Sequence, residues 1–288
     1  MKFIAIPIVM GHEFAGEVIA AGPEADWKIG DYVGALHRDS CGMCPRCVEG
    51  ETGQCAFAMR VFGITIDGGY ASHVLAPSRA LYALPDSLRG AAGAILNSTF
   101  GTAYRAMNRF GGLSHGQTVL ITGANGGVGI GGIQIAKRQG ADVLAVVRSE
   151  EHVDFVTSLG ADLVIVDDGS GFHKKLPGDG VDVVLDCVGS PTFNSSLRSV
   201  RLGGGIGLVG NVSEERVAVN MGRIVVGDVR ICGSTGATPR DLAALVAIQN
   251  GDPMRFVIEE LPLSEANSAH ERLRVGGLRG RLVLVPKI

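Results

Sequence analysis

The sequence predicts an α/β protein built from a doubly wound parallel sheet and a second, β-rich domain that carries a metal-binding lobe. Beyond residue 100, short apolar runs typical of strands alternate with segments of helical periodicity. This alternation implies parallel strands joined by helical crossovers that cover both faces of a sheet. Up to about residue 96 the chain has short β-prone runs, turns and four closely spaced cysteines, and 288 residues give room for two domains.

The β-rich part is expected to contain three strands. Runs at 17–21 and 32–36 favour β structure, and the turn signal Gly22-Pro23 follows the first of them. A run from Gly68 to Leu75 is expected to form the third strand. None of these runs has the length or spacing of a helix, so this part is expected to be strand and loop.

The alternating part is expected to contain a strand before each helical crossover. Apolar residues at helical spacing, such as Val153, Val156 and Leu159, occupy the intervals between the strands. The expected strands are 118–122, 143–147, 163–166, 181–186 and 206–209.

Four cysteines follow a C-x2-C-x2-C-x7-C spacing: Cys41, Cys44, Cys47 and Cys55. Zn²⁺ binds four thiolates tetrahedrally, and a site with all four positions filled by protein is structural. An iron–sulfur cluster is the weaker alternative, because Ala56 rather than proline follows the last cysteine. Disulfides are disfavoured because Cys187 and Cys232 lie alone in apolar runs, as in a reduced cytosolic protein.

A glycine-rich turn follows the expected strand 118–122 and leads into a helical pattern. Between a strand and a helix, such glycines allow a tight turn, backbone access for a pyrophosphate and close helix packing. The phosphates would bind free N–H groups at the helix N-terminus. A merely tight strand–helix turn is the alternative. The expected dinucleotide-binding residues here are Gly123, Ala124, Asn125, Gly126, Gly127, Val128 and Gly129.

The end of the next strand indicates which dinucleotide binds. An NAD site usually has Asp or Glu there to bind the ribose 2′-hydroxyl, whereas this strand ends in Arg148-Ser149. An arginine and a hydroxyl suit a 2′-phosphate, which favours NADP(H) over NAD(H). Glu150 and Glu151 follow directly, and Ser149 is also a candidate cap for the helix that they would begin.

The charge and the apolar content of the chain indicate which kinds of binding partner are disfavoured. The net charge is −3 with 46% apolar residues and no run of like charge, which argues against nucleic-acid binding and against a basic membrane patch. The apolar run from Phe3 to Met10 is short and lacks a cleavage pattern, and no stretch reaches the length of a membrane span. We therefore expect a cytoplasmic protein that acts on a small molecule.

Several spaced motifs resemble the medium-chain dehydrogenase/reductase superfamily, in its zinc-containing alcohol dehydrogenase-like branch. They are the four-cysteine lobe, Gly11-His12-Glu13, Gly30-Asp31, Gly101-Thr102-Ala-Tyr104 and Gly280-Arg281-Leu-Val283. The resemblance implies a GroES-like catalytic domain over 1–98, rejoined by 252–288, and a Rossmann NAD(P)-binding domain over 99–251. It also implies cofactor contacts by Thr102, Gly210 and Arg281, and a homo-oligomer, dimer or tetramer, formed through the edge strand Val229–Gly233.

The resemblance also names candidate catalytic residues. In the family, a catalytic zinc is held by a cysteine upstream of the Gly-His-Glu motif, by its histidine and by a second cysteine before the Thr-Ala-Tyr helix. Here the sequence begins ten residues before Gly11, so we expect the upstream ligand to be missing, and Ser98 occupies the second cysteine position. His12 and Glu13 remain as metal-binding or catalytic candidates, with a plain core role as the alternative for His12. The other histidines are expected on the surface or in packing: His37, His73, His115, His152, His173 and His270.

Three functions follow from these motifs. The first is an NADP(H)-dependent oxidoreductase of the zinc alcohol dehydrogenase-like type, which transfers hydride between nicotinamide and an alcohol or carbonyl. The second is a metal-independent enoyl reductase, similar to quinone or acryloyl-CoA reductases, which Ser98 and the run 186–193 favour. The third is a truncated, catalytically silent nucleotide-binding protein.

Overall fold

The computed structural model describes residues 6–57 and 60–287. The chain divides into two compact units. Unit 1 comprises Met1–Gly101 and Gly236–Ile288, and unit 2 comprises Thr102–Thr235. Residues 236–251 thus group with unit 1, whereas the sequence assigned them to the nucleotide-binding domain.

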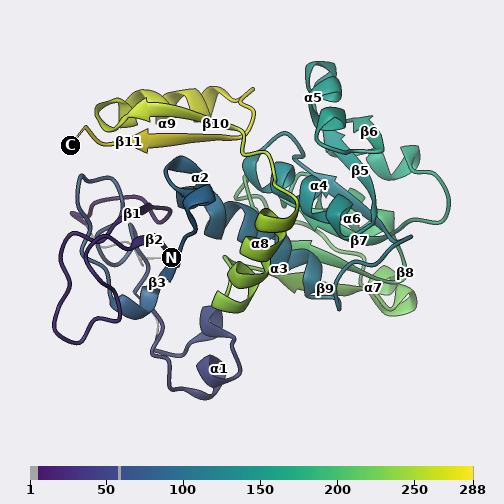
Figure 1. Cartoon of the computed structure of the whole chain (residues 1–288). Helices are drawn as coiled ribbons and strands as arrows, with labels where there is room; N and C mark the ends of the chain where they lie inside the picture. Colours follow the sequence, from purple (N-terminus) through teal and green to yellow (C-terminus); the bar gives the residue numbers. More distant parts are fainter. Residues whose placement is uncertain (1–5, 58–59, 288) are drawn as a thin grey trace. The chain divides into compact units, whose positions relative to one another are not determined.

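Unit 2 is a six-stranded parallel sheet with helices packed on it (Figure 1). In chain order its strands are β4 (Thr118–Thr122), β5 (Asp142–Val147), β6 (Leu163–Val166), β7 (Val181–Asp186), β8 (Val200–Leu208) and β9 (Arg230–Gly233). They lie in the order β6-β5-β4-β7-β8-β9. This is the doubly wound order, in which the winding reverses between two central strands, here β4 and β7.

The expected strands of this sheet are confirmed, with one substantial difference. β8 begins at Val200 instead of residue 206. Its first residue pairs with Val181 of β7, and the register then shifts before Gly205 pairs with Val183. The glycines at 203–205 weaken the sequence signal, because glycine has low strand propensity.

The two faces of this sheet are covered by different helices, because successive side chains of a strand point to opposite faces. Leu120 lies in a buried cluster with Leu197 of α6. Its neighbour Ile121 lies against Gly132 of α4, where an added Cβ would be 3.2 Å from Ile121 Cδ1. The helices of unit 2 are α3 (Thr102–Asn108), α4 (Gly127–Arg138), α5 (Val153–Ser158), α6 (Phe193–Ser199) and α7 (Met221–Gly227).

Unit 1 contains two small sheets and short helices. Its strands are β1 (Ala15–Glu17), β2 (Tyr32–Ala35) and β3 (Leu81–Ala83), all antiparallel, and the parallel pair β10 (Ile258–Pro262) and β11 (Arg281–Val285). Its α-helices are α1 (Pro45–Val48), α2 (Ala91–Ile95), α8 (Pro239–Gly251) and α9 (Ala266–Val275). A π-helical segment, Leu96–Gly101, continues α2. Short 3₁₀ helices complete the chain at Thr52–Gln54, Ser78–Ala80, Asp86–Leu88, Glu150–His152, Phe172–Lys175 and Leu263–Glu265.

Two strand predictions in unit 1 are wrong. The first strand covers Ala15–Glu17 instead of 17–21, because the chain leaves the sheet after pairing with β2. No strand forms from Gly68 to Leu75. The backbone N–H groups of Gly68 and Gly69 instead donate to the carbonyls of Val9 and Gly11, so a close loop contact replaces the ladder.

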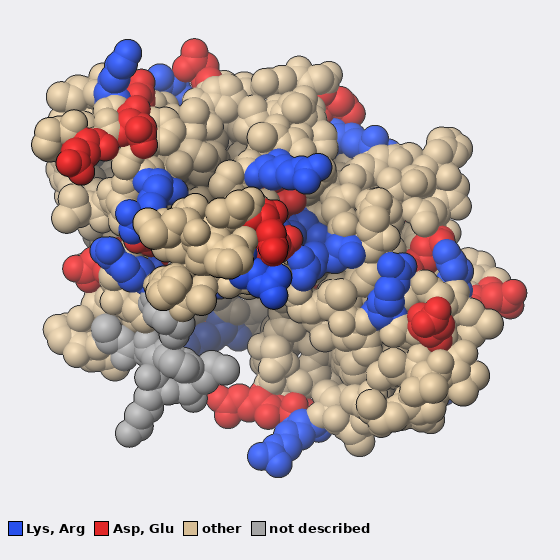
Figure 2. Space-filling view, turned by 90° about the horizontal axis from the view of Figure 1, so that it is seen from below, with Lys and Arg blue, Asp and Glu red and all other residues tan. Residues whose placement is uncertain are grey.

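No helix in the described part of the chain is long and apolar enough to cross a membrane. On the face drawn in Figure 2, acidic and basic side chains are interspersed and no area of one sign covers it. This agrees with the small net charge of −3.

Candidate functional site

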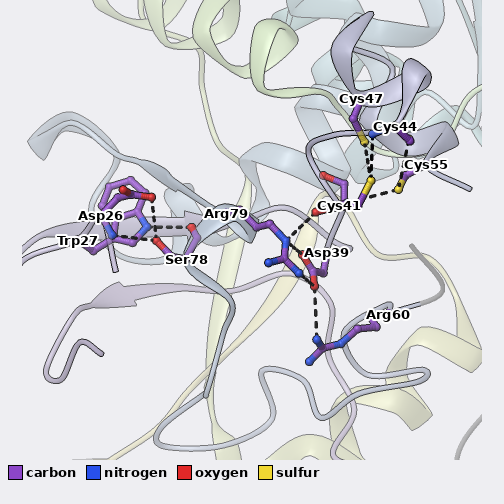
Figure 3. Close-up of polar contacts among 11 residues, drawn as sticks. Asp26, Trp27, Asp39, Cys41, Cys44, Cys47, Cys55, Arg60, Ser78 and Arg79 are labelled. Atoms are coloured by element: carbon purple, nitrogen blue, oxygen red, sulfur yellow. Dashed lines mark hydrogen bonds and ion pairs between the residues drawn. The ribbon is translucent and has the colours of Figure 1, made fainter. Parts of the chain in front are cut away.

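Four thiols meet in one lobe of unit 1. The Sγ atoms of Cys41, Cys44, Cys47 and Cys55 all lie within 4.8 Å of one another and are drawn together in Figure 3. The Cys41–Cys47 and Cys44–Cys55 sulfur pairs are both 3.9 Å apart. Four sulfurs bound tetrahedrally at about 2.3 Å from one zinc ion would be about 3.8 Å apart. The predicted structural zinc ligands therefore have the spacing of a zinc site.

The backbone of this lobe favours thiolates. The Cys44 N–H points at the Cys41 sulfur at 3.3 Å, and the Cys41 N–H points at the Cys55 sulfur at 3.4 Å. The Cys47 backbone N–H lowers the pKa of Cys44 to about 6, whereas burial raises the pKa of Cys47 to about 12, so the backbone contacts favour a thiolate at Cys44 but not at every cysteine of the lobe. Thiolates are the form that binds metal, so both the donor type and the spacing fit a closed tetrathiolate centre.

A buried carboxylate anchors the chain where it enters this lobe. The Asp39 side chain is 3% exposed and accepts from Arg79 Nη2 at 2.7 Å, while Arg60 Nη1 lies 3.6 Å away (Figure 3). Arg79 Nε also donates to the Ser40 carbonyl at 2.7 Å. These contacts fix the two residues that precede Cys41.

In unit 2, the glycine turn lies at the carboxyl end of β4. An added Cβ on Gly129 would be 2.5 Å from the Gly123 carbonyl oxygen, so only glycine fits there. Gly126 precedes α4 and caps it with no side-chain hydrogen bond. The N–H groups of the first turn of α4 are thus available to an anion. This is the arrangement that a dinucleotide pyrophosphate requires.

The segment after β7 lies against this turn. An added Cβ on Gly123 would be 3.1 Å from Val188 Cγ2, and one on Gly210 would be 2.1 Å from the Cys187 carbonyl oxygen. The ends of β4, β7 and β8 therefore meet at the sheet's switch point, where ligands bind in doubly wound folds. Burial raises the pKa of the Cys187 thiol above its usual range, so this cysteine is protonated.

Asp186, at the end of β7, organises these segments and was missed by the sequence reasoning. Its side chain is fully buried and accepts from five donors. Oδ1 accepts from Thr122 Oγ1 at 3.0 Å, and Oδ2 accepts from Ser196 Oγ at 2.6 Å. The other donors are the N–H of Val188 (3.0 Å), the N–H of Gly189 (2.9 Å) and Thr192 Oγ1 (2.7 Å).

The residues expected to select the dinucleotide lie at the end of β5. Arg148 is exposed, and the Ser149 side chain accepts from the Glu151 N–H at 3.4 Å, so Ser149 is the predicted cap. His152, expected to be a surface or packing residue, is buried. Its Nε2 lies 3.5 Å from Asn125 Nδ2 of the glycine turn. Thr102, also expected to contact cofactor, is buried at the start of α3.

The expected catalytic residues of unit 1 have different surroundings in the structure. His12 is exposed. Glu13 accepts from Thr99 Oγ1 at 2.9 Å and forms an ion pair with Arg281. Arg281 was expected to contact cofactor, and here its guanidinium pairs with this carboxylate. Ser98 lies in the π-helical segment, and its Oγ is buried with no hydrogen-bond partner among the described residues.

His37 is a further residue that sequence reasoning placed among surface or packing histidines. It is 7% exposed and lies two residues beyond the buried end of β2. Its Nε2 accepts from Arg38 Nε at 2.7 Å, and its Nδ1 is buried with no hydrogen-bond partner among the described residues. The feature of the sequence that could have singled out His37 is its position between the end of a strand and the cysteine lobe.

Comparisons with known proteins identify the family to which this chain belongs. A family described as "Zinc-binding dehydrogenase" matches residues 127–250, and one described as "Alcohol dehydrogenase GroES-like domain" matches residues 1–86. An acryloyl-coenzyme A reductase of Metallosphaera sedula is 33% identical over 281 residues, covering 96% of this chain and 83% of that protein. The chain belongs to the zinc-type medium-chain dehydrogenase/reductase superfamily.

Other relatives in this superfamily agree. An alcohol dehydrogenase of Geobacillus stearothermophilus is 32% identical over 284 residues, covering 97% of this chain and 83% of that protein. A crystal structure described as that of AibC is 39% identical, with a TM-score of 0.92, and covers 100% of this chain and 82% of that one. The chain is thus an alcohol dehydrogenase-like oxidoreductase with a Rossmann-type and a GroES-like domain.

The residues present do not fit a catalytic zinc site. Within residues 6–57 and 60–287, the four-cysteine lobe is the one group of three or more metal-binding side chains whose ligand atoms come together. A catalytic zinc needs three protein ligands. Of the candidates, Glu13 is paired with Arg281 and Ser98 offers a hydroxyl, which binds zinc poorly. Four thiolates and a free helix N-terminus do fit a structural zinc and a nicotinamide dinucleotide.

Proposed function

We propose that this oxidoreductase uses NADP(H) and transfers hydride between the nicotinamide and an alcohol or carbonyl substrate. The observation that carries the proposal is the composition of the switch point. An uncapped helix N-terminus follows β4, and an exposed arginine, Arg148, follows β5. The first suits the pyrophosphate and the second suits a 2′-phosphate.

Each part of this site has a task in holding the dinucleotide. The first N–H groups of α4 bind the pyrophosphate, and Gly129 allows the backbone to approach it closely. Arg148 and the Ser149 hydroxyl bind the 2′-phosphate. Asp186 holds the segment after β7 against the glycine turn through Thr122 and the Gly189 N–H. When bound, the nicotinamide supplies or accepts the hydride.

A second candidate function is reduction of an activated C=C bond without a catalytic metal. Ser98 in the position of a family zinc ligand favours it, as does the pairing of Glu13 with Arg281. The relative from Metallosphaera sedula is named an acryloyl-coenzyme A reductase. An enoyl thioester carries its own electron-withdrawing carbonyl, so hydride addition needs hydrogen-bond donors at that oxygen and no metal.

The cofactor assignment is tested by titrating NADPH and NADH into wild type and Arg148→Ala. Loss of a charge-assisted hydrogen bond should weaken NADPH binding by about 1.5–3 kcal/mol. NADH affinity should stay almost unchanged. Arg201→Ala, which removes an exposed arginine paired with Asp182 in the same unit, is the matched control. Equal loss for both cofactors would remove Arg148 from the 2′-phosphate site.

The reaction is tested with the zinc-loaded wild-type protein. NADPH oxidation is followed with an aliphatic ketone and, separately, with acryloyl-CoA, and NADP⁺ reduction is followed with a secondary alcohol. Turnover of the ketone and alcohol supports the first function, and turnover of acryloyl-CoA alone supports the second. We expect total zinc near one ion per chain, held by the four-cysteine lobe. Two ions per chain would contradict our interpretation that His12, Glu13 and Ser98 do not form a catalytic zinc site.

A further inference from the structure

We propose that Arg79 is a positioning residue for the zinc of the four-cysteine lobe and sets how long the lobe retains the ion. It acts through one peptide unit, which joins Ser40 to Cys41 and lies between the guanidinium and the sulfurs. The proposal rests on zinc occupancy of the lobe, which the spacing of its four sulfurs fits. All the residues concerned belong to unit 1.

The Ser40–Cys41 peptide unit is hydrogen-bonded at both of its polar groups. The Ser40 carbonyl accepts from Arg79 Nε at 2.7 Å, and the Cys41 N–H points at Cys55 Sγ at 3.4 Å. A trans peptide unit is planar, so its C=O and its N–H point in opposite directions. Arg79 and Cys55 therefore hold the two ends of one rigid unit, and the place of the first constrains the N–H that reaches the second.

The charge of Arg79 strengthens this N–H as a donor. A hydrogen bond from a cation is stronger than one from a neutral group, and consecutive hydrogen bonds polarise one another. A guanidinium at the Ser40 carbonyl thus makes the Cys41 N–H a better donor to the Cys55 sulfur. Hydrogen bonds of this kind orient the ligands of a metal ion and tune their hold on it. Cys41 and Cys55 are both predicted ligands, so one contact of Arg79 affects two of the four sulfurs.

Asp39 fixes the orientation of the guanidinium. Its side chain is 3% exposed and accepts from Arg79 Nη2 at 2.7 Å. The planar guanidinium therefore donates to the carboxylate through Nη2 and to the peptide unit through Nε, in a geometry that its rigid fork of donors imposes. Although 55% of the Arg79 side chain is exposed, both of these nitrogens donate to buried residues, since Ser40 is 7% exposed.

The backbone of Arg79 is held by parts of unit 1 outside the lobe. The Leu36 N–H donates to the Ala80 carbonyl at 2.8 Å, and Trp27 Nε1 donates to the Ser78 carbonyl at 2.9 Å (Figure 3). Ala80 is fully buried. Arg79 thus reaches the lobe across 39 positions of sequence from a segment with its own anchors. It holds the lobe from a place that does not depend on the metal.

The test compares two variants that differ in one donor. The amide nitrogen of Arg79→Gln stands as many bonds from Cα as Arg Nε does, so it can donate to the Ser40 carbonyl without a charge. Arg79→Met has a methyl group at that place. Both variants remove the Nη2 donor to Asp39, so the effect of its loss is common to them. Arg46→Met is the matched control, because Arg46 lies in the lobe, pairs with Glu49 and is 58% exposed.

Zinc retention is measured as the rate at which the zinc-loaded proteins release the ion to a coloured chelator. Loss of an outer hydrogen bond typically weakens metal binding by about 10–100-fold, so Arg79→Met should release zinc about 10–100-fold faster than wild type. Arg79→Gln should release it clearly more slowly than Arg79→Met, and Arg46→Met at the wild-type rate. With Co²⁺ in place of zinc, the sulfur-to-metal charge-transfer band of Arg79→Met should move to lower energy, because a sulfur with a weaker N–H donor holds its electrons less tightly.

Amide hydrogen exchange in the zinc-loaded wild-type protein gives a readout that does not depend on how the variants fold. The Cys41 amide should be protected, and an unprotected amide would overturn the proposal. A folded Arg79→Met protein that retains zinc as wild type does would overturn it too, as would equal release rates for the Gln and Met variants. A wild-type protein that binds no zinc removes the assignment of the lobe together with the proposal, whereas zinc release unaffected by Arg79→Met removes Arg79 alone.

Discussion

Removing the carboxylate of Asp186 should uncouple the cofactor turn from the segment after β7. Five donors converge on this fully buried side chain, and no cationic side chain is among them. Asp186→Ala leaves the N–H groups of Val188 and Gly189 without their acceptor. It also frees the Thr122 hydroxyl, which accepts from the Cys187 N–H at 3.0 Å.

The expected loss of stability follows from these donors. An unsatisfied buried donor costs about 1–3 kcal/mol, so two backbone N–H groups give about 2–6 kcal/mol for Asp186→Ala. Asp186→Asn keeps one oxygen at the place of Oδ1, which accepts four of the five bonds. Its amide replaces Oδ2, where the Ser196 hydroxyl can turn to accept. We therefore expect the Asn variant to lose clearly less stability than the Ala variant, by about 1–3 kcal/mol.

The assay is urea unfolding of the zinc-loaded proteins, followed by circular dichroism, with NADPH titration alongside. Asp142→Ala is the control, because this carboxylate is exposed at the start of β5. The Ala variant should unfold at markedly lower urea and bind NADPH more weakly than either the Asn variant or the control. An Ala variant with a wild-type midpoint, or an Asn variant as unstable as the Ala variant, would refute this account of the network.

Three further predictions concern the lobe, the turn and the sheet edge. Cys44→Ser leaves three thiolates, so its zinc should be lost to a chelator, as measured by elemental analysis, while Cys232→Ser keeps its zinc. Gly129→Ala places a methyl group 2.5 Å from the Gly123 carbonyl oxygen, so NADPH binding should be lost in a titration that still shows a folded protein by circular dichroism. Strand β9 (Arg230–Gly233) ends the sheet and is expected to pair across a dimer, so light scattering should give twice the 29.9 kDa chain mass; a monomer at micromolar concentration would contradict this.

The parallel sheet was predictable because its strands are buried on both faces. Such strands read as continuous apolar runs, like 118–122 and 181–186, and these need no knowledge of distant residues. The β-rich unit offers weaker patterns. Gly68 illustrates the difficulty: an added Cβ there would lie 2.0 Å from the Gly11 carbonyl oxygen. The loop contact that replaces the expected strand joins residues more than fifty positions apart, and no local pattern encodes it.

The candidate site divides in the same way. The cysteine lobe and the glycine turn are local motifs, since spacing alone brings their atoms together, and both were found from the sequence. The contacts of Asp186 and Asn97 depend on partners far along the chain, such as Ala237 for Asn97 across 140 positions.

A single histidine between a strand and a cysteine motif gives no sign of whether it faces solvent. Only the fold reveals that Arg38 takes one ring nitrogen of His37 while burial leaves the other without an acceptor. Charged and polar residues are seldom fully buried unless they are paired. His37 Nδ1 and Ser98 Oγ are among the buried side-chain atoms of the described residues that have no hydrogen-bond partner, and this property depends on the fold and is encoded in no local pattern.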